Sequence, residues 1–416
     1  MSGKVGVLIV GLNGATANTT VVGTILQQEG VVSGSSFKKG MLTEDGCLAR
    51  HDLVDEAQVI FGGWDVTNAS AYEAAVRNRV FDGACFYPIR YKLREVKPMK
   101  AVCTSHDVNE AITSENTRNG ASLLHKVQGL RQDITLFKKN NGLDEAVVVY
   151  LASPLKMRGA RYYTSLEEFE KGLLNNDPGI TSAMLYAYAA LQEGCPFVDF
   201  TPNITLEVPA LLELAESNNI PLAGRDGSTG QTLMKTLIGQ MLKIRNLKLE
   251  GWYSTNILGN NDGKVLSLSE HAEVKMRDKL SVLEPLLGYS DFHHSVNIEY
   301  YRPRGDNKEA WDNIDFLGWL DQPMSMKINW LGRDSILAAP LILDLIKLLE
   351  YAHRIGEKGI QSHLAVFFKN PLGTKVRGFF DQYKLFSDYY TSLASKKEKQ
   401  TDNVAVAAQA AFPKYH

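Results

Sequence analysis

The sequence predicts an α/β protein built on a doubly wound, mostly parallel sheet. Strand and helix patterns alternate along residues 1–225, and a β-branched, apolar run at residues 4–10 meets a glycine-rich turn that opens into a helix-compatible stretch. The chain has 416 residues, which is too long for one ordinary domain and suits two or three.

The strand at residues 4–10 is almost wholly apolar, as is typical of a strand covered on both faces. The same patterns predict further strands at 58–62, 146–151, 197–200 and 247–258. They predict helices at 19–28, 179–191, 209–217, 232–242, 269–282 and 335–355. The last of these is apolar on most faces and should be buried, and Pro340 is tolerable in its first turns.

Composition excludes several classes of protein. The formal net charge is −2, which gives no general attraction for nucleic acid or an anionic membrane. No run of about 18 apolar residues exists, and the N-terminus lacks a signal-peptide cleavage pattern, so we expect a cytoplasmic protein. The four cysteines form no CxxC pair and are expected to be reduced, buried thiols.

The glycine turn at residues 11–18 could bind a nucleotide. Gly11, Gly14, Ala15 and Ala17 let the backbone approach a pyrophosphate at a helix N-terminus. An ordinary tight turn is the alternative. Asp65 follows the second strand and could accept hydrogen bonds from a ribose, or it could simply cap a turn.

Two other segments could carry chemistry. The polar turn at 226–232 precedes a helix, and its backbone amides could bind a phosphate monoester or merely form a helix cap. Lys275 and Lys279 share one face if 269–282 is helical. Two adjacent ammonium groups repel each other, which lowers the pKa of such a lysine. A lysine of this kind suits proton transfer and oxyanion stabilisation. A solvated basic face is the alternative.

The motifs together resemble the inositol-1-phosphate synthase family over nearly the whole chain, and in the same order. GNNDG at 259–263 precedes Lys275 and Lys279 at the family's spacing. The other matching segments are 11–16 (GGNNGST in the family), 62–65 (GWD), 201–205 (SPQNT), 224–232 (GDD-x-x-SGQT), 305–308 (GDSK) and 333–340 (EDSLLAAP).

This resemblance implies an NAD-dependent, redox-neutral isomerase that converts glucose 6-phosphate to 1D-myo-inositol 3-phosphate. The family oxidises C5, forms an enolate, closes the ring by an aldol step and reduces C5 again. The alternatives are a related NAD-dependent sugar-phosphate cyclase or dehydrogenase with another substrate, and a nonenzymatic NAD-binding regulator. Four converging lysines argue against the regulator.

The resemblance also implies which residues form the site. The catalytic set is Lys275, Lys279, Lys308, Lys375, Asp226 and Asp306. The NAD+ contacts are Gly11, Asn13, Gly14, Ala15, Thr16, Asp65, Ala152, Ser153, Asp226, Asn261, Asp262, Asp334 and Ser335. The substrate contacts are Ser228, Thr229, Gly230, Gln231, Asn256, Asn260 and Lys279.

Within the catalytic set, the resemblance gives Lys275 the proton transfer at C5. Lys308 and Lys375 lie around the developing oxyanions, and Lys279 helps to hold the phosphate. The aspartates orient the lysines or the cofactor. Family members differ in requiring a divalent metal or a monovalent cation, and the sequence does not choose between these.

The resemblance further implies an NAD-binding Rossmann-like domain formed by residues 1–225 and 331–416. A central α+β domain, residues 226–330, would carry catalytic groups and the contacts of a homotetramer. Four features depart from the family pattern and put the substrate and some cofactor contacts in question. They are Arg225, Leu233, Lys264 and the strand end at 150–155.

Overall fold

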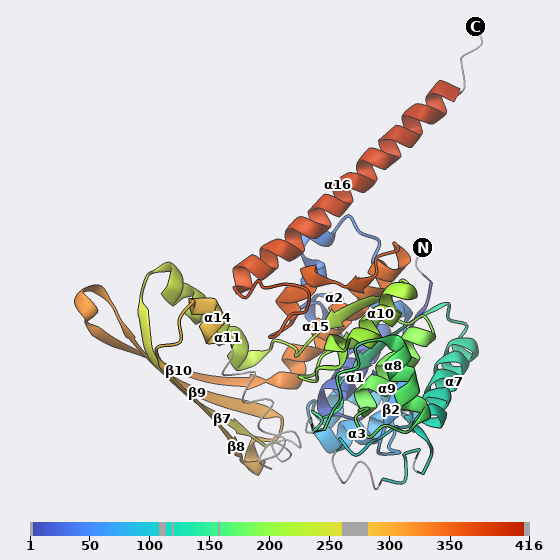
Figure 1. Cartoon of the computed structure of the whole chain (residues 1–416), viewed down its shortest axis with the longest axis horizontal. Helices are drawn as coiled ribbons and strands as arrows, with labels where there is room; N and C mark the ends of the chain where they lie inside the picture. Colours follow the sequence, from blue (N-terminus) through green and yellow to red (C-terminus); the bar gives the residue numbers. More distant parts are fainter. Residues whose placement is uncertain (1–2, 108–113, 119, 157–158, 260–281, 412–416) are drawn as a thin grey trace.

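The computed structural model describes residues 3–107, 114–118, 120–156, 159–259 and 282–411, and from residue 397 onward it describes the backbone alone. Two sheets organise the chain (Figure 1). No helix among the described residues combines the length and apolar composition that a membrane span requires.

The larger sheet has seven strands, and all of its strand pairs are parallel. Across the sheet the strands are β11 (Gly359–Ile360), β6 (Pro221–Gly224), β5 (Phe197–Asp199), β4 (Glu145–Tyr150), β1 (Val5–Val10), β2 (Val59–Asp65) and β3 (Met99–Lys100). The chain builds outward from β1 in both directions, which is the order of a doubly wound sheet. The predicted fold class is therefore confirmed.

Helices cover both faces of this sheet. Because side chains alternate along β1, Val7 and Ile9 pack on one face and Leu8 and Val10 on the other. The first face is covered by α1 (Ala15–Gln28), α2 (Gly34–Phe37), α3 (Ala71–Asn78), α4 (Gly83–Phe86), α5 (Arg90–Glu95), α15 (Asp334–Arg354) and α16 (Phe379–Ala411). The second face is covered by α7 (Leu123–Asn141), α8 (Leu166–Leu174), α9 (Ser182–Gln192) and α10 (Pro209–Ser217).

The smaller sheet has four strands. In order they are β10 (Pro323–Arg333), β9 (Asn307–Leu317), β7 (Lys248–Leu258) and β8 (His293–Tyr300). Only the β7–β8 pair is parallel. The helices α11 (Gly230–Ile244) and α14 (Leu283–Leu287) pack on one face of this sheet, around Trp252 and Ile314.

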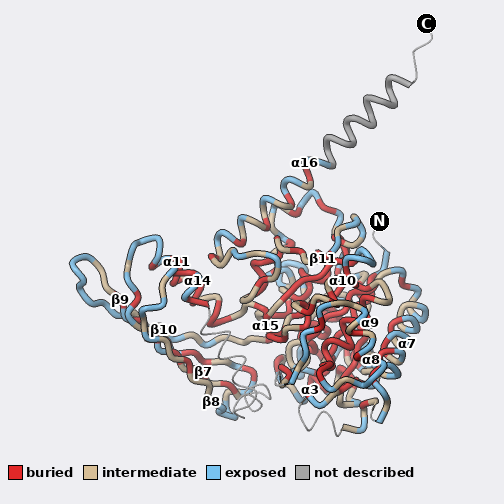
Figure 2. The backbone as a smooth tube through the Cα atoms, viewed as in Figure 1, coloured by how far each residue is buried: buried red, intermediate tan, exposed pale blue. Residues whose placement is uncertain are grey.

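The chain enters the smaller sheet after β6 and returns through α15, which packs beside α1. Both connections therefore lie where the two sheets meet. In Figure 2 the core around the larger sheet is mostly red, whereas exposed and intermediate residues run along the smaller one.

The predicted elements that fall on described residues are present. Their ends agree within a few residues; the largest difference is at α1, which begins at Ala15 rather than at residue 19. The predicted helix at 269–282 lies almost entirely outside the described residues. The division into domains at residues 225 and 330 stays a prediction.

Candidate active site

The turn after β1 brings free backbone amides to the start of α1. Gly11 has a φ of +86°, and a Cβ there would lie 3.0 Å from the backbone of Ala152, so only glycine allows this approach. Gly14 precedes α1, and no side chain caps the helix by a hydrogen bond. The amides at Ala15 and Thr16 can therefore bind an anion, which the helix dipole also favours.

The predicted cofactor residues that follow β1, β2 and β4 lie together at the carboxyl edge of the larger sheet. Strand order reverses between β1 and β4, and dinucleotides bind in the crevice at such a point. Ala152 and Ser153 follow β4 closely, and the Leu151 amide donates to the carbonyl of Val10 at 3.0 Å. The two loops that would hold NAD+ thus lie side by side.

Asp65 ends β2 and is buried. One carboxylate oxygen accepts from the Asn13 amide at 2.8 Å, and the other accepts from the amide and hydroxyl of Thr67, both at 2.8 Å. These contacts fix the glycine turn. Each oxygen can accept a further bond, so contact with a ribose stays a prediction.

A second uncapped helix start lies at α11. Thr229 precedes the helix without a side-chain cap, and no acidic residue occupies the first turn. The predicted phosphate site at residues 228–231 is therefore compatible with this geometry, with one change. The Ser228 amide already donates to the carbonyl of Phe367 at 2.8 Å, so Ser228 can offer only its hydroxyl.

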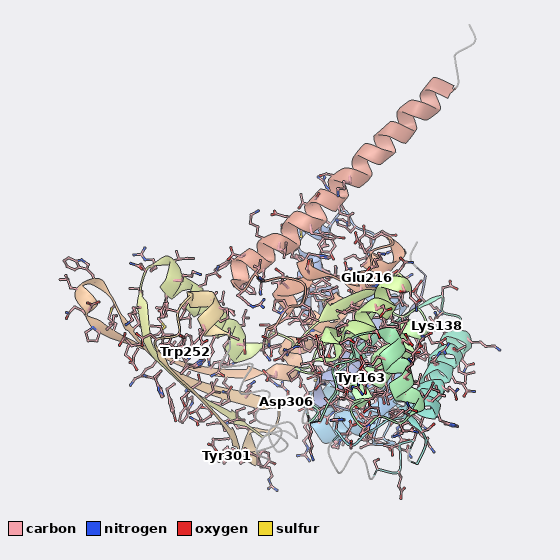
Figure 3. All side chains as sticks on the ribbon, viewed as in Figure 1. Lys138, Tyr163, Glu216, Trp252, Tyr301 and Asp306 are labelled. Atoms are coloured by element: carbon pink, nitrogen blue, oxygen red, sulfur yellow. The ribbon has the colours of Figure 1, made fainter. Side chains whose placement is uncertain are left out.

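Three predicted motifs meet beside this helix start. The Lys308 ammonium on β9 lies 2.6 Å from the Asp334 carboxylate at the start of α15. The Ser335 hydroxyl donates to Asp306 at 2.9 Å. A Cβ on Gly230 would lie 3.1 Å from Asp334, so α11 approaches the same pair. Figure 3 shows Asp306 where the smaller sheet faces the larger α/β part.

Asp226 is held by a lysine that the motifs did not indicate. Its buried carboxylate lies 2.8 Å from the ammonium of Lys369. The Lys369 amide also donates to the Asp226 carbonyl at 2.7 Å. The negative charge of Asp226 is therefore balanced by Lys369, and the site includes a lysine beyond the predicted four.

Two buried carboxamides point to a polar ligand. Asn256 is 0% exposed, and neither its side-chain oxygen nor its nitrogen has a hydrogen-bond partner within the described part of the chain. The Gln231 oxygen likewise has none there, although its nitrogen donates to Asp312. Buried polar groups without partners are costly, so both carboxamides are suited to a bound polar molecule.

Several predicted residues are not joined to this group. Lys275, Lys279, Asn260, Asn261 and Asp262 lie outside the described residues, as does Lys264. Lys375 is exposed in the segment before α16, and no hydrogen bond or ion pair links it to any described residue. Its role at the oxyanions stays a prediction.

Arg225, which departs from the family pattern, is already paired. Its guanidinium forms an ion pair with Glu207 and donates to the carbonyl of Pro202 at 3.0 Å. Its charge is therefore neutralised within the protein. An effect of this arginine on substrate choice stays a prediction.

Two residues that contact predicted site residues, Asp312 and Lys369, were not predicted from the sequence. Lys308, Ala310 and Asp312 are two residues apart and lie on one face of β9. Strand periodicity could therefore have placed Asp312 on the same face as Lys308. Lys369 carries no such signal, because tertiary packing alone brings it to Asp226.

No group of three or more His, Cys, Asp or Glu side chains in the described part of the chain could hold a metal ion. His294 lies with its Nε2 2.7 Å from the ammonium of Lys235. A neighbouring cation of this kind disfavours metal binding to this histidine.

Comparison with known proteins tests the family. A model of an NAD-binding family described as myo-inositol-1-phosphate synthase matches residues 5–390. Inositol-3-phosphate synthase 1 of Bacteroides thetaiotaomicron is 37% identical over 95% of this chain and 97% of its own. The inositol-3-phosphate synthase of Saccharomyces cerevisiae is 27% identical over 86% of this chain and 75% of its own.

Solved structures agree. The crystal structure of inositol-3-phosphate synthase from Caenorhabditis elegans superposes with a TM-score of 0.86 and 25% identity, covering 95% of this chain and 86% of that one. A myo-inositol-1-phosphate synthase-related protein from Thermotoga maritima has the same fold, with a TM-score of 0.77 and 24% identity, covering 93% of this chain and 98% of that one. The family indicated by the motifs is confirmed, and the chain belongs to the myo-inositol-1-phosphate synthase family.

Proposed function

We propose that this protein is an inositol-3-phosphate synthase, which converts glucose 6-phosphate to 1D-myo-inositol 3-phosphate without net oxidation. Relatives that carry this name match 95% and 86% of this chain. The observation that carries the proposal is a pair of buried carboxamides beside an uncapped helix start, those of Gln231 and Asn256, whose oxygens have no hydrogen-bond partner among the described residues. Such a site suits a small polyol that bears a phosphate.

The residues around the larger sheet fit NAD+. The α1 amides would hold the pyrophosphate, and the contact between Gly11 and Ala152 keeps side chains out of the crevice. Bound there, NAD+ would take a hydride from C5 of the open-chain sugar and return it after ring closure. Asp65 supports this site by holding Asn13 in place.

The chain's own cations would handle the charge that develops on oxygen. Lys308, oriented by Asp334, would stabilise an oxyanion, and Asp306 would hold Ser335 at the same corner. We propose Lys275 for proton transfer at C5, Lys279 for contact with the phosphate and Lys375 as a further cation. The amides of α11 would bind the phosphate itself.

We further propose a homo-oligomer, with a tetramer expected, that assembles through the face of the smaller sheet that points away from α11 and α14. Large apolar side chains lie on this face: Tyr253 is 51% exposed, Trp311 50% and Leu331 64%. Exposed apolar patches of this kind are typical of subunit contacts.

The decisive experiment uses glucose 6-phosphate with a catalytic amount of NAD+. We expect inositol phosphate, identified by NMR, to accumulate while the absorbance of free NADH stays flat. Release of one NADH per substrate would replace the synthase with a dehydrogenase. Parallel reactions with EDTA and with added ammonium establish whether a divalent or monovalent cation takes part.

A further inference from the structure

A buried carboxylate lies directly behind the proposed substrate site. Asp312 on β9 is 6% exposed, and three donors converge on its Oδ1. These are Gln231 Nε2 at 3.0 Å, the Trp252 indole nitrogen at 2.7 Å and the Ser254 hydroxyl at 2.7 Å. The carboxylate therefore joins the first turn of α11 to both β7 and β9.

This arrangement decides which way the Gln231 carboxamide faces. An ionised carboxylate only accepts hydrogen bonds, and an indole N–H only donates them. Gln231 must therefore turn its NH2 group toward Asp312, where Nε2 is also 3.2 Å from Oδ2. Its Oε1 must then point the other way, and that atom is buried with no partner among the described residues.

We infer that Asp312 is a positioning residue that fixes Gln231 with its carbonyl oxygen toward the substrate, where it accepts a hydrogen bond from a sugar hydroxyl. This inference rests on the proposed function. A phosphate dianion could not use this oxygen, because both partners would be acceptors. The backbone amides of α11 would therefore bind the phosphate, and the Gln231 side chain in the same helical turn would bind a hydroxyl of the polyol.

The position of Asn256 supports this assignment. Asn256 follows Ser254 on the same face of β7, so it lies beyond the residue that bonds Asp312. Its carboxamide is fully buried and has no partner within the described chain. Together, Gln231 and Asn256 offer acceptors and a donor, which is the pattern that adjacent hydroxyl groups require.

The test compares two probes as competitive inhibitors: inorganic phosphate, and glucitol 6-phosphate, which carries the hydroxyls but cannot cyclise. The variants are Asp312→Asn and Gln231→Leu. Because Trp252 and Ser254 both donate to Oδ1, an asparagine at 312 keeps its oxygen there and places its NH2 group at the Oδ2 position, 3.2 Å from Gln231 Nε2. Two donors then face each other, which releases the Gln231 carboxamide from its fixed orientation. Asp144→Asn is the matched control, because Asp144 is exposed just before β4, at the edge of the larger sheet opposite the proposed site.

We expect each variant to weaken glucitol 6-phosphate binding about 10-fold, the effect of one lost hydrogen bond, with inorganic phosphate unchanged. KM for glucose 6-phosphate should rise more than kcat falls. The double variant should bind glucitol 6-phosphate no more weakly than Gln231→Leu alone, because both changes remove the same contact. If Asp312 had a merely structural role, the double variant would bind glucitol 6-phosphate more weakly than Gln231→Leu alone.

Equal weakening of both probes, or no weakening of either, would overturn the inference. If Asp312→Asn does not fold, Gln231→Leu alone decides the matter by the same two probes. A wild-type protein that forms no inositol phosphate would instead reject the proposed function, which separates the two failures.

Discussion

At the scale of single residues, the charges of the site are held in pairs that tie one segment to another. Lys369 holds Asp226, and Lys308 holds Asp334. Asp312 is held by neutral donors instead. Paired in this way, the groups keep their orientation before substrate arrives, which is what electrostatic stabilisation of a transition state requires.

The Lys308 pair gives the first prediction. Lys308→Met should lower kcat by about 10²–10³, because it removes a preorganised cation beside the developing oxyanion. The affinity for NAD+, measured by fluorescence titration, should change little. Lys171→Met is the control, since Lys171 also pairs with a carboxylate, that of Glu167, but on the exposed surface of α8. Retention of more than about a tenth of kcat would remove Lys308 from the catalytic set.

A second prediction concerns Lys235 on α11, whose ammonium is buried between this helix and the smaller sheet. Burial lowers the pKa of Lys235 to about 8, while attraction to Asp312 partly offsets the effect. Between pH 8 and the unfolded value of 10.5 the unfolded chain binds more protons than the folded one. Stability should therefore rise with pH across this window, by up to about 1.4 kcal/mol per pH unit.

Urea unfolding of wild type and Lys235→Met at pH 8, 9 and 10 measures this. The difference in unfolding free energy between the two proteins isolates the contribution of Lys235 from other titrating groups. It should move in favour of the wild type as the pH rises. A difference that stays constant from pH 8 to 10 would contradict the lowered pKa of buried Lys235.

At the scale of elements, apolar runs were predictable from the sequence, whereas three of the four mixed polar and apolar strands of the smaller sheet, β8, β9 and β10, were not. The buried strands β1 and β4 and the helix α15 are nearly continuous apolar runs, so their positions followed directly. β9 alternates buried and exposed residues around several charges, which hides a strand among loop-like polar residues. β6 has only four residues, too few for any periodicity.

The helix α7 was missed although its signal is present. Leu123, Val127, Leu130 and Ile134 are its buried residues, at spacings of four, three and four. That is helical periodicity on one face of an otherwise polar stretch. For the site, the motifs named Lys308 and Asp334 individually, and the structure shows that they pair. No local pattern could show the pairing of Lys369 with Asp226, because these residues are 143 positions apart.

A third prediction tests the element that would hold NAD+. Gly11→Ala should weaken NAD+ binding by at least about 10-fold, because a Cβ at 3.0 Å from the Ala152 backbone pushes the two loops apart and a φ of +86° strains alanine. Gly23→Ala is the control. Gly23 lies within α1 with no atom near its added Cβ, so this change should leave NAD+ binding unchanged and stabilise the helix slightly.

At the scale of the whole molecule, the two faces of the smaller sheet have different tasks. One face packs against α11 and α14 and presents Asn256 and Lys308 toward the site. The opposite face carries exposed Tyr253, Trp311 and Leu331. Consecutive residues of β7 and β9 alternate between these faces. A contact between subunits would therefore involve the same strands that carry the substrate-binding residues.

The last prediction follows from this alternation. Light scattering should give wild type a mass of four times 46.1 kDa. Trp311→Arg, which places a charge in the apolar patch, should yield smaller species at micromolar concentration. Because Trp311 directly precedes Asp312, loss of the subunit contact should also raise KM for glucose 6-phosphate.

Tyr91→Arg is the control, since Tyr91 is 62% exposed on α5 of the larger part. The mass and KM of this variant should match those of the wild type. A Trp311→Arg protein that remains fully assembled would show that subunits meet elsewhere, and a monomeric wild type would exclude assembly through this face altogether.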